Sequence, residues 1–482
     1  MSAPLVSPAG LIGYDAAQDS HVRSTLIFPR NSRVEYNRWG RRRLLEKSRA
    51  VEANFPFVTR IKNKIGRGVA GKGIFPFPVT QDQEWNGLAR QLFDVWASNP
   101  ATYSIDASRD MWEDQRIAAE EIGAGDGEFF TALVNRDGMA MTQPLDPFEF
   151  ETPWGVFNEF EDAVKTDEYL KPVQYSCRTL PSPWQPYTAT WTTIPAEGLI
   201  HLFRRRRAKH LRGLPPLYSA MNDANDAMDW LGLEKATDKL HAALGIAKVI
   251  DPANSGKGIT GKVEELLGTT TDPERKKQFE NFWSGAGVIE LNKGESLQML
   301  TSNRPGAPAI EGIKLLFHLI ALGADLHLSV VFSYVGLGGT PTRAEMEDAQ
   351  NTFDLRQDFI VWRHSQRIYN RRLAVAQETG ELRRCRDPYW WRTDWHGPAK
   401  ITVDYGRSAA ANIDLMKAGM LSIPRYYEER GLDPDTEMDK QIAWLKRAQQ
   451  RCEEEGVDFS RFMEATPGTV TQVNMPESSP EE

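Results

Sequence analysis

Hydrophobic residues recur at helical spacing in the N-terminal part of the chain. One such pattern comprises Phe57, Val58, Ile61, Ile65 and Val69, which would share one face of an amphipathic helix. Similar spacing predicts helices that start near Asn37 and that cover residues 85–96 and 109–123. The segment GIFPFPVT, at residues 73–80, cannot continue a helix, because it has two prolines within three positions.

The pattern changes after residue 123. FFTALV, at residues 129–134, follows a turn cluster and is typical of a strand, and residues 139–203 contain further short apolar runs between Pro- and Gly-containing turns. A long Ala-rich helical pattern covers residues 218–244. Two brief strands are expected around VIEL (288–291) and SLQML (296–300).

Helical patterns also dominate the C-terminal part. Residues 310–328 predict an apolar helix, which is followed by the glycine-rich segment FSYVGLGGTP at 332–341. The longest helical pattern covers residues 342–380, and a last one covers residues 408–460. The patterns together predict an α+β fold that is mainly helical.

The most apolar stretch carries too much charge for a membrane span. Residues 313–336 include Lys314 and Asp325, and charges are rare within membrane helices. The first ten residues lack a basic region followed by an apolar core, so we expect no secretory signal and no membrane partner. The three cysteines, Cys177, Cys385 and Cys452, lie far apart, which favours a reducing compartment.

The glycine cluster GRGVAGKG, at residues 66–73, has two conventional functional interpretations. It fits both the G-x-x-x-x-G-K spacing of a phosphate-binding loop and the G-x-G-x-x-G spacing of a dinucleotide fold. Both motifs need a strand before the loop and a helix after it, whereas here a helix precedes and a proline-broken segment follows. We therefore interpret the cluster as a helix C-cap followed by a tight turn.

The segment LFRRRRAKHLRGL, at residues 202–214, is strongly basic. Its cationic residues are Arg204, Arg205, Arg206, Arg207, Lys209 and Arg212. They could contact the DNA backbone, pair with acidic side chains of a neighbouring subunit, or form a solvated loop. Because the chain carries a net charge of −8, we favour the subunit contact over DNA.

No catalytic constellation is evident in the sequence. The eight histidines form no H-E-x-x-H pattern, and no G-x-S-x-G elbow occurs. His318 and His327 are nine positions apart and would not share one helix face, which disfavours a metal site. We expect a protein without enzymatic activity, catalytic residues, metal or cofactor.

Four segments in order resemble the lambda-type portal proteins of tailed bacteriophages. The first is RRLLEKSRAVEANFPFVTRIKNKIGRGVAGKGI at 42–74, and the second is WEDQRIAAEEIGAGDGEFF at 112–130, in which a Gly-Glu pair starts a strand. The third, IPAEGLIHLFRRRRAKHLRGLPPLYSAMNDANDAMDW at 194–230, contains a His…Arg-Gly-x-Pro pattern. The fourth is DLMKAGMLSIPRYYEERGLDPDTEMDKQIAWLKR at 414–447. The resemblance extends over about residues 30–460. It implies the portal-protein fold, with wing, stem, clip and crown regions.

The resemblance implies a homo-oligomeric ring, usually of twelve subunits, at one vertex of the capsid. Such a ring would be the channel for packaging and ejecting double-stranded DNA, without sequence preference. It would dock the terminase large subunit and later a head–tail adaptor, and contact capsid and scaffold proteins. The protein would belong to the virion and assemble in the host cytoplasm. The alternatives are another virion structural or adaptor protein and, with less support, a nucleic-acid-processing enzyme.

The order of elements then assigns regions to the chain. The expected regions are an N-terminal arm (1–30), a wing (31–255), a stem helix (256–285), a clip (286–307), a second stem helix (308–328), a tunnel loop (329–341), a long wing helix with its connection (342–400), a crown (401–465) and a disordered tail (466–482). The tunnel-loop residues expected to face DNA are Ser333, Tyr334, Gly336, Gly338, Gly339 and Thr340. The clip residues expected to face terminase are Glu290, Asn292, Lys293 and Glu295.

Overall fold

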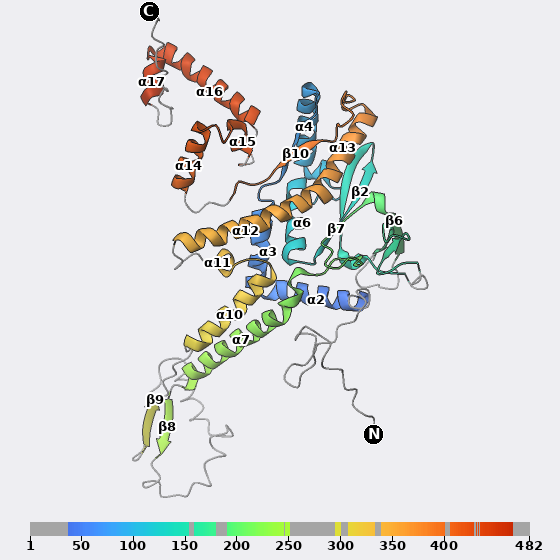
Figure 1. Cartoon of the computed structure of the whole chain (residues 1–482). Helices are drawn as coiled ribbons and strands as arrows, with labels where there is room; N and C mark the ends of the chain where they lie inside the picture. The colour runs from blue at the N-terminus through green and yellow to red at the C-terminus, as the bar shows by residue number, and fades with distance from the viewer. Residues whose placement is uncertain are drawn as a thin grey trace, which may run out of the picture. The chain divides into compact units, whose positions relative to one another are not determined.

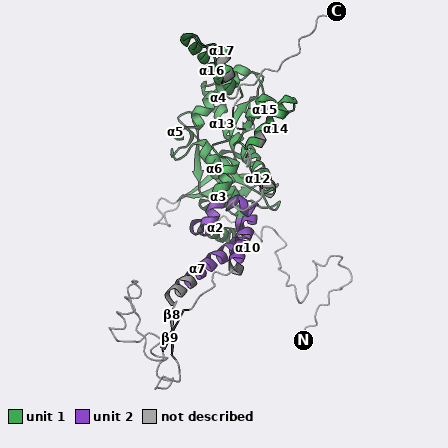
Figure 2. Ribbon diagram, turned by 90° about the vertical axis from the view of Figure 1, so that its left-hand side faces the viewer, with its two compact units in different colours: residues 1–49, 62–216, 336–482 green, residues 50–61, 217–335 purple. Residues whose placement is uncertain are grey.

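The computed structural model describes most of the chain in two compact units. The described residues are 37–153, 159–179, 190–244, 246–250, 295–299, 307–332, 339–400, 405–428, 430, 432 and 434–465. Unit 1 comprises residues 1–49, 62–216 and 336–482, and unit 2 comprises residues 50–61 and 217–335 (Figure 2). The predicted arm, first stem helix and tail lie outside the described residues.

The N-terminal helices occur where the apolar spacing predicts them. They are α2 (Arg38–Asn54), α3 (Pro56–Val69), α4 (Gln83–Ala97), α5 (Pro100–Tyr103) and α6 (Met111–Ala124). Helix α6 begins at an N-cap, because the Asp110 side chain accepts a hydrogen bond from the backbone N–H of Glu113. The proline-broken segment that follows α3 forms strand β1 (Phe75–Pro78).

The longest predicted helix is continuous except for one π-helical turn. It consists of α12 (Gly339–Ile360), the π-turn η7 (Val361–Ser365) and α13 (Gln366–Thr379) (Figure 1). The helix ends at Gly380, whose φ of 79° places it in the left-handed region that glycine favours at a helix end. A π-turn inserts one extra residue and rotates the following side chains, and such turns often occur at functional sites.

The described residues of unit 1 form three small antiparallel sheets. Their strands, in sheet order, are β3 (Met139–Leu145), β2 (Glu128–Arg136) and β7 (Leu199–Phe203); β4 (Val164–Thr166), β5 (Pro172–Thr179) and β6 (Thr190–Pro195); and β1 with β10 (Thr393–His396). The strands confirm the predicted β content of residues 139–203. In the first sheet, Phe130 on β2 is opposite His201 on β7.

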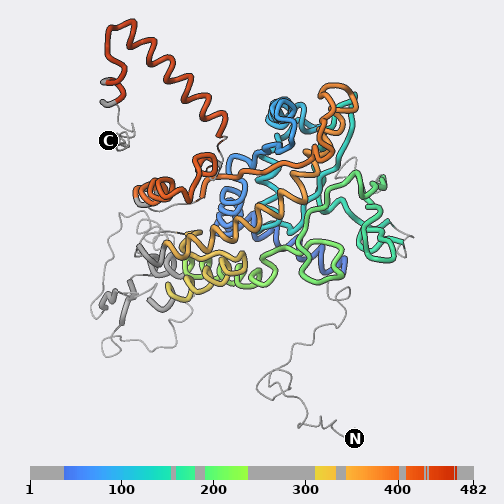
Figure 3. The backbone as a smooth tube through the Cα atoms, turned by 45° about the horizontal axis from the view of Figure 1, so that its top comes forward, coloured from blue at the N-terminus to red at the C-terminus, as the bar shows by residue number. Residues whose placement is uncertain are grey.

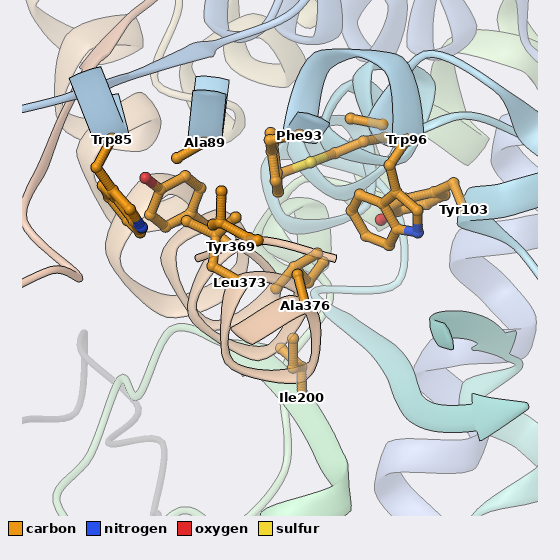
Figure 4. Close-up of a cluster of buried hydrophobic side chains, with 13 residues drawn as sticks. Trp85, Ala89, Phe93, Trp96, Tyr103, Ile200, Tyr369, Leu373 and Ala376 are labelled. Carbon is orange, nitrogen blue, oxygen red and sulfur yellow. The ribbon is translucent and has the colours of Figure 1, made fainter. Parts of the chain in front are cut away.

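Aromatic side chains form a large part of the core of unit 1 (Figure 4). Phe93 from α4 meets Tyr369 from α13, with ring centres 5.0 Å apart, and Trp96, one turn further along α4, packs against Phe93 at 5.4 Å. The indole N–H of Trp85 donates to the carbonyl of Arg383, so a deeply buried polar group is satisfied. The periodic aromatic residues of the two helices therefore make one shared core.

The cluster GRGVAGKG forms a corner, as predicted. Helix α3 ends at Val69, and the backbone N–H of Gly71 bonds to the carbonyl of Gly66 at 3.1 Å. Gly71 has a φ of 55° and Gly73 a φ of 133°. Residues other than glycine rarely adopt these backbone conformations. The chain then enters β1, so neither a strand before the cluster nor a helix after it is present.

One glycine of this cluster also permits close helix packing. A Cβ added to Gly68 would lie 2.5 Å from the ring of Phe353, which is buried on α12. We predict that Gly68→Ala lowers the free energy of unfolding by about 1–3 kcal/mol, because the ring has no room to move. The midpoint of urea unfolding measures this loss.

Gly87→Ala is the matched control for Gly68→Ala. Gly87 lies inside α4 with no atom within 4 Å of the added Cβ. Alanine is the better helix former, so this variant should gain about 0.5–1 kcal/mol. Equal losses for the two variants would contradict the packing role of Gly68.

Unit 2 is built around a pair of helices, α7 (Met221–Leu244) and α10 (Ala307–Gly323), which pack against each other. A Cβ on Gly312 of α10 would lie 2.2 Å from the ring of Trp230 on α7, so glycine allows this close approach. The short helix α11 (Leu328–Val331) and the strand pair β8 (Ile246–Ile250) and β9 (Glu295–Met299) also belong to the unit.

One sequence expectation for this part of the chain is wrong. The apolar helix ends at Gly323, before residue 328, because the chain turns at Asp325, which has a φ of 60°. Helix α7, which lies within the expected wing at residues 31–255, belongs to unit 2 with α10, and the wing assignment stays a prediction. Strand β8 directly follows the end of α7 and pairs with β9, a partner that the sequence did not indicate.

The C-terminal part is helical, as predicted for residues 408–460. Its helices are α14 (Tyr405–Lys417), α15 (Ile423–Glu428), α16 (Pro434–Glu455) and α17 (Phe459–Ala465), at the red end of the tube in Figure 3. Helices α15, α16 and α17 contact one another in sequence order. Acidic residues at the start of α16, Asp435 and Glu437, suit the positive end of the helix dipole.

Candidate functional site: a basic groove and an apolar helix face

The predicted DNA-facing and terminase-facing residues fall largely outside the described chain. Ser333, Tyr334, Gly336, Gly338, Glu290, Asn292 and Lys293 are not among the described residues. Gly339 and Thr340 begin α12, so the expected loop ends at least three residues earlier than position 341. Glu295 is the first residue of β9 and pairs with Ile250 of β8. The roles of these residues remain predictions.

The basic segment after β7 divides into an exposed part and a buried part. Arg204, Arg205, Arg206, Arg207 and Lys209 are exposed. Arg212 is only 2% exposed and is enclosed within unit 1. The expectation that Arg212 contacts DNA or another subunit is therefore wrong, because its guanidinium cannot reach either one.

Arg212 instead forms a buried ion pair with Glu128 at the start of β2. Its Nε donates to Glu128 Oε2 at 2.9 Å, and its Nη2 donates to Glu128 Oε1 at 2.7 Å. The backbone N–H of Gly213 donates to the same carboxylate at 3.0 Å. Arg41 on α2 completes the network, with Nε 2.6 Å from Asp162 Oδ2 and Nη1 3.4 Å from Glu128 Oε1. This bidentate, charge-assisted arrangement fixes the base of the basic segment.

Burial and charge act in opposite directions on the groups of this network. Burial would raise the pKa of Glu128, but Arg212, His201 and Arg41 together hold that pKa well below its usual value. For His201, burial lowers the pKa to about 4 in spite of the nearby carboxylate. At neutral pH the network therefore contains an ionised glutamate, two arginines and a neutral histidine.

A groove in unit 1 opens beside the exposed part of the basic segment. It has a volume of about 1110 Å³ and lies between residues of β5 and β7 and one face of the long helix. Its basic side chains are Lys171, Arg204, Arg205, Arg363 and Arg367, and its acidic side chains are Asp167 and Glu197. We call this hollow the arginine groove. Arg363 and Arg367 could not be singled out from the sequence, because two arginines four positions apart on a helix are typical of a solvated face.

Unit 2 presents an apolar helix face to solvent. On α10, Leu315, Leu319 and Leu322 are 60%, 40% and 49% exposed and recur at helical spacing on one side. The opposite side of the helix carries Ile320, which is buried. Helix α10 is thus apolar on two sides, and only one of them is covered within the described chain.

The same unit carries a second apolar feature, an aromatic cluster. The rings of Phe57 and Phe317 stack at 4.7 Å, and Phe55 and Phe332 lie beside them. These residues line a hollow of about 610 Å³. Phe55 and Phe57 are buried, whereas Phe332 is exposed.

A buried carboxylate–histidine pair is the arrangement closest to catalytic chemistry. His364 Nε2, on the π-turn, lies 3.1 Å from Asp114 Oδ2, and the hydroxyl of Tyr103 donates to the same oxygen at 2.8 Å. All three side chains are sealed from solvent, so no substrate reaches them. Their contacts link α5, α6 and the long helix, which is a structural role.

Neither a metal cluster nor a membrane helix emerges from the described ranges. Within them, no group of three or more His, Cys, Asp or Glu side chains is placed to hold a metal ion. No helix that the structure describes is both long and apolar enough to cross a membrane.

The chain is similar to known portal and particle-neck proteins. The family model described as "Phage portal protein, lambda family" matches residues 28–357. Among solved structures, the neck of an empty gene transfer agent particle, computed with C6 symmetry, gives a TM-score of 0.46 at 15% identity, covering 82% of this chain and 95% of that one. An HK97-family phage portal protein from Corynebacterium diphtheriae gives 0.33 at 13% identity, covering 62% and 82%. No curated protein matches the chain.

Proposed function

Because the chain belongs to the lambda family of phage portal proteins, we propose that it assembles as a ring at one vertex of a phage capsid. About twelve copies would enclose a channel through which double-stranded DNA is packaged and ejected. The match over residues 28–357 is the observation that carries this proposal. The protein would act as a conduit without enzymatic activity, and the motor chemistry would belong to a docked terminase.

The exposed face of α10 supports the ring. Three leucines on one side of a helix would be costly to leave in water, and a neighbouring copy can cover them. Closed cyclic symmetry gives each subunit two different contact faces. The uncovered side of α10 therefore fits a contact between adjacent subunits.

The architecture of unit 2 refines the expected regions. We assign the paired helices α7 and α10 to the stem, in place of residues 256–285 and 308–328. The strand pair β8–β9 adjoins α7 through Leu244–Ile246 in the sequence and would form part of the clip that docks terminase and later a head–tail adaptor. Unit 1 without its C-terminal helices would be the wing, and α14–α17 the crown.

The charge of the chain supports a sliding contact with DNA. A net charge of −8 disfavours tight binding of phosphates, which would stall DNA in the channel. The tunnel loop, which would lie between α11 and α12 at residues 332–338 in place of 329–341, would meet the DNA. Its glycines would permit the movement that such a loop needs.

Deleting Gly336–Thr340 tests the tunnel-loop assignment. We expect the ring to assemble with unchanged mass and DNA packaging to fall at least tenfold, because the loop would contact DNA and not the neighbouring subunit. Packaged DNA is measured by nuclease protection, and ring mass by mass photometry. A variant that replaces the five residues by serines keeps the loop length and should package more DNA than the deletion. Loss of the ring on deletion would show that the loop is part of the subunit contact.

A further inference from the structure

The arginine groove has walls from distant parts of the chain. Phe359, Arg363 and Arg367 stand four positions apart on the long helix and line one wall. Arg204 and Arg205, directly after β7, line the other. His201 stacks on Phe203, with ring centres 4.3 Å apart, in the floor. The groove is thus a cationic trough with an aromatic floor.

The arginines of the groove have no anionic partner among the described residues. Arg205 and Arg363 contact aromatic rings, Phe203 at 5.9 Å and Phe359 at 5.2 Å. Neither Arg204 nor Arg367 forms an ion pair with a described side chain. By contrast, Arg212, Arg41 and Arg49 elsewhere in the unit are each paired with a carboxylate.

The unpaired guanidinium of Arg367 is only partly exposed to water. Its side chain is half-buried, and this burial lowers the pKa of its guanidinium, opposed only by Tyr175. Tyr175, whose hydroxyl lies 3.3 Å from His201 Nδ1, is in turn surrounded by the positive charges of Arg212, Arg367 and Arg205. A partly buried cation gains from an incoming anion more than an exposed one does, because water screens it less.

We propose that the arginine groove binds an acidic segment of a second copy of this chain, residues 453–458 at the end of α16. This inference rests on the proposed ring, in which each subunit meets the next. The segment CEEEGVD holds Glu453, Glu454, Glu455 and Asp458, all of them exposed. It is the densest acidic run in the chain, so it complements the groove in charge.

The carboxylates of this segment are available for binding. Glu453 and Glu454 accept hydrogen bonds only from Gln449 and Gln450, one helical turn earlier, and Asp458 accepts one from the backbone N–H of Ser460. None of the four acidic side chains forms an ion pair with a described residue. Guanidinium groups bind carboxylates in a forked, bidentate geometry, and four arginines on two walls can hold several carboxylates at once.

A peptide segment fits the groove better than duplex DNA does. The groove is concave and its floor is partly apolar, with Tyr175, Phe203 and Phe359 beside the cations. A rigid duplex presents only phosphates to such a surface and cannot cover the rings, whereas the methylene groups of glutamate side chains can.

Charge reversal and its rescue test the contact in the full chain. Arg205→Glu with Arg363→Glu changes one exposed arginine on each wall, and Glu453→Lys with Glu454→Lys and Glu455→Lys reverses the segment. Each set alone should reduce the fraction of chains in rings at least tenfold at 0.15 M salt. The combination should restore it to within about threefold of the wild type. The matched control is Arg136→Glu with Arg371→Glu, exposed positions outside the groove, which should leave the rings intact.

The outcomes distinguish a failure of the groove contact from a failure of the proposed ring. A wild-type chain that forms no ring contradicts the proposed function and this contact with it. If the wild-type chain forms rings and both charge-reversed variants form them equally well, the groove contact is overturned and the ring stands. The same holds if the combined variant forms no more rings than either set alone. Rings that stay intact in the arginine variant while binding of a fluorescent 30-base-pair duplex falls tenfold would assign the groove to DNA, which also overturns the proposal.

Discussion

Replacing Leu315 and Leu319 with glutamate should turn the assembled ring into single chains while each chain stays folded. Both side chains are exposed on α10, at 60% and 40%, so the substitutions should change the free energy of unfolding by no more than about 0.5 kcal/mol. In a subunit contact the same carboxylates would be buried without partners, at a cost of several kcal/mol per contact. Mass photometry measures the assembly, and the thermal midpoint by circular dichroism measures the fold.

Lys314→Glu provides the matched control on the same helix. It changes the charge by the same amount as the two leucine substitutions together, and Lys314 is also exposed. It leaves the leucine stripe intact, so we expect rings of normal mass. Rings that persist in the double leucine variant would place the subunit contact elsewhere. Loss of rings in both variants would show that charge, and not apolar burial, governs assembly.

Glu128→Gln should lower the free energy of unfolding by about 3–5 kcal/mol. Removal of one member of a buried ion pair leaves the others charged and unpaired. Here Arg212, 2% exposed, loses both of its carboxylate bonds, and Arg41 loses one partner. Urea unfolding, followed by tryptophan fluorescence, measures the loss.

A surface pair is the control for Glu128. Glu46→Gln breaks the pair between Glu46 and Arg42 on α2, in which both side chains are about half exposed, and should cost less than about 0.5 kcal/mol. A double variant, Glu128→Leu with Arg212→Met, removes both buried charges and should recover part of the loss. Equal effects of Glu128→Gln and Glu46→Gln would contradict the network's role.

The helices were predictable because their signal is local. The apolar residues of α3 and the long helix repeat at a spacing that one helix face requires, so both elements appear within a few residues of their predicted bounds. The early end of α10 was not predictable in this way, since the apolar pattern continues to Leu326 and Leu328 although the chain turns at Asp325. Strand β8 is five residues long and depends on β9 for its hydrogen bonds.

Contacts between distant segments could not be predicted from spacing. Glu128 and Arg212 are 84 positions apart, and the sequence placed Arg212 with its exposed neighbours because all of them are basic. The fold separates Arg212 from these exposed neighbours, since the chain turns inward only after Lys209. Arg363 was not predicted as a site residue, because the residues that line the groove with it come from β5 and β7, far away in the sequence.

Two motifs that carried the family resemblance meet in the buried network. The Gly-Glu pair that opens β2 contributes Glu128, and the His…Arg-Gly pattern contributes His201, Arg212 and Gly213. A Cβ on Gly213 would lie 2.3 Å from the carbonyl oxygen of Gly127, so glycine is required there. These motif residues hold the sheet and the basic segment together. Their role is structural, and surface residues carry the proposed contacts.

The mass of the purified wild-type chain tests the ring most directly. Twelve copies of a 54.5-kDa chain give a particle of about 650 kDa, and negative-stain images should show a ring with a central hole. Mass photometry at nanomolar and micromolar concentrations measures the assembly without assuming a shape. A closed ring of about twelve subunits is the result that the portal function predicts. A chain that stays single across that range, or that forms an open polymer of variable mass, would contradict it.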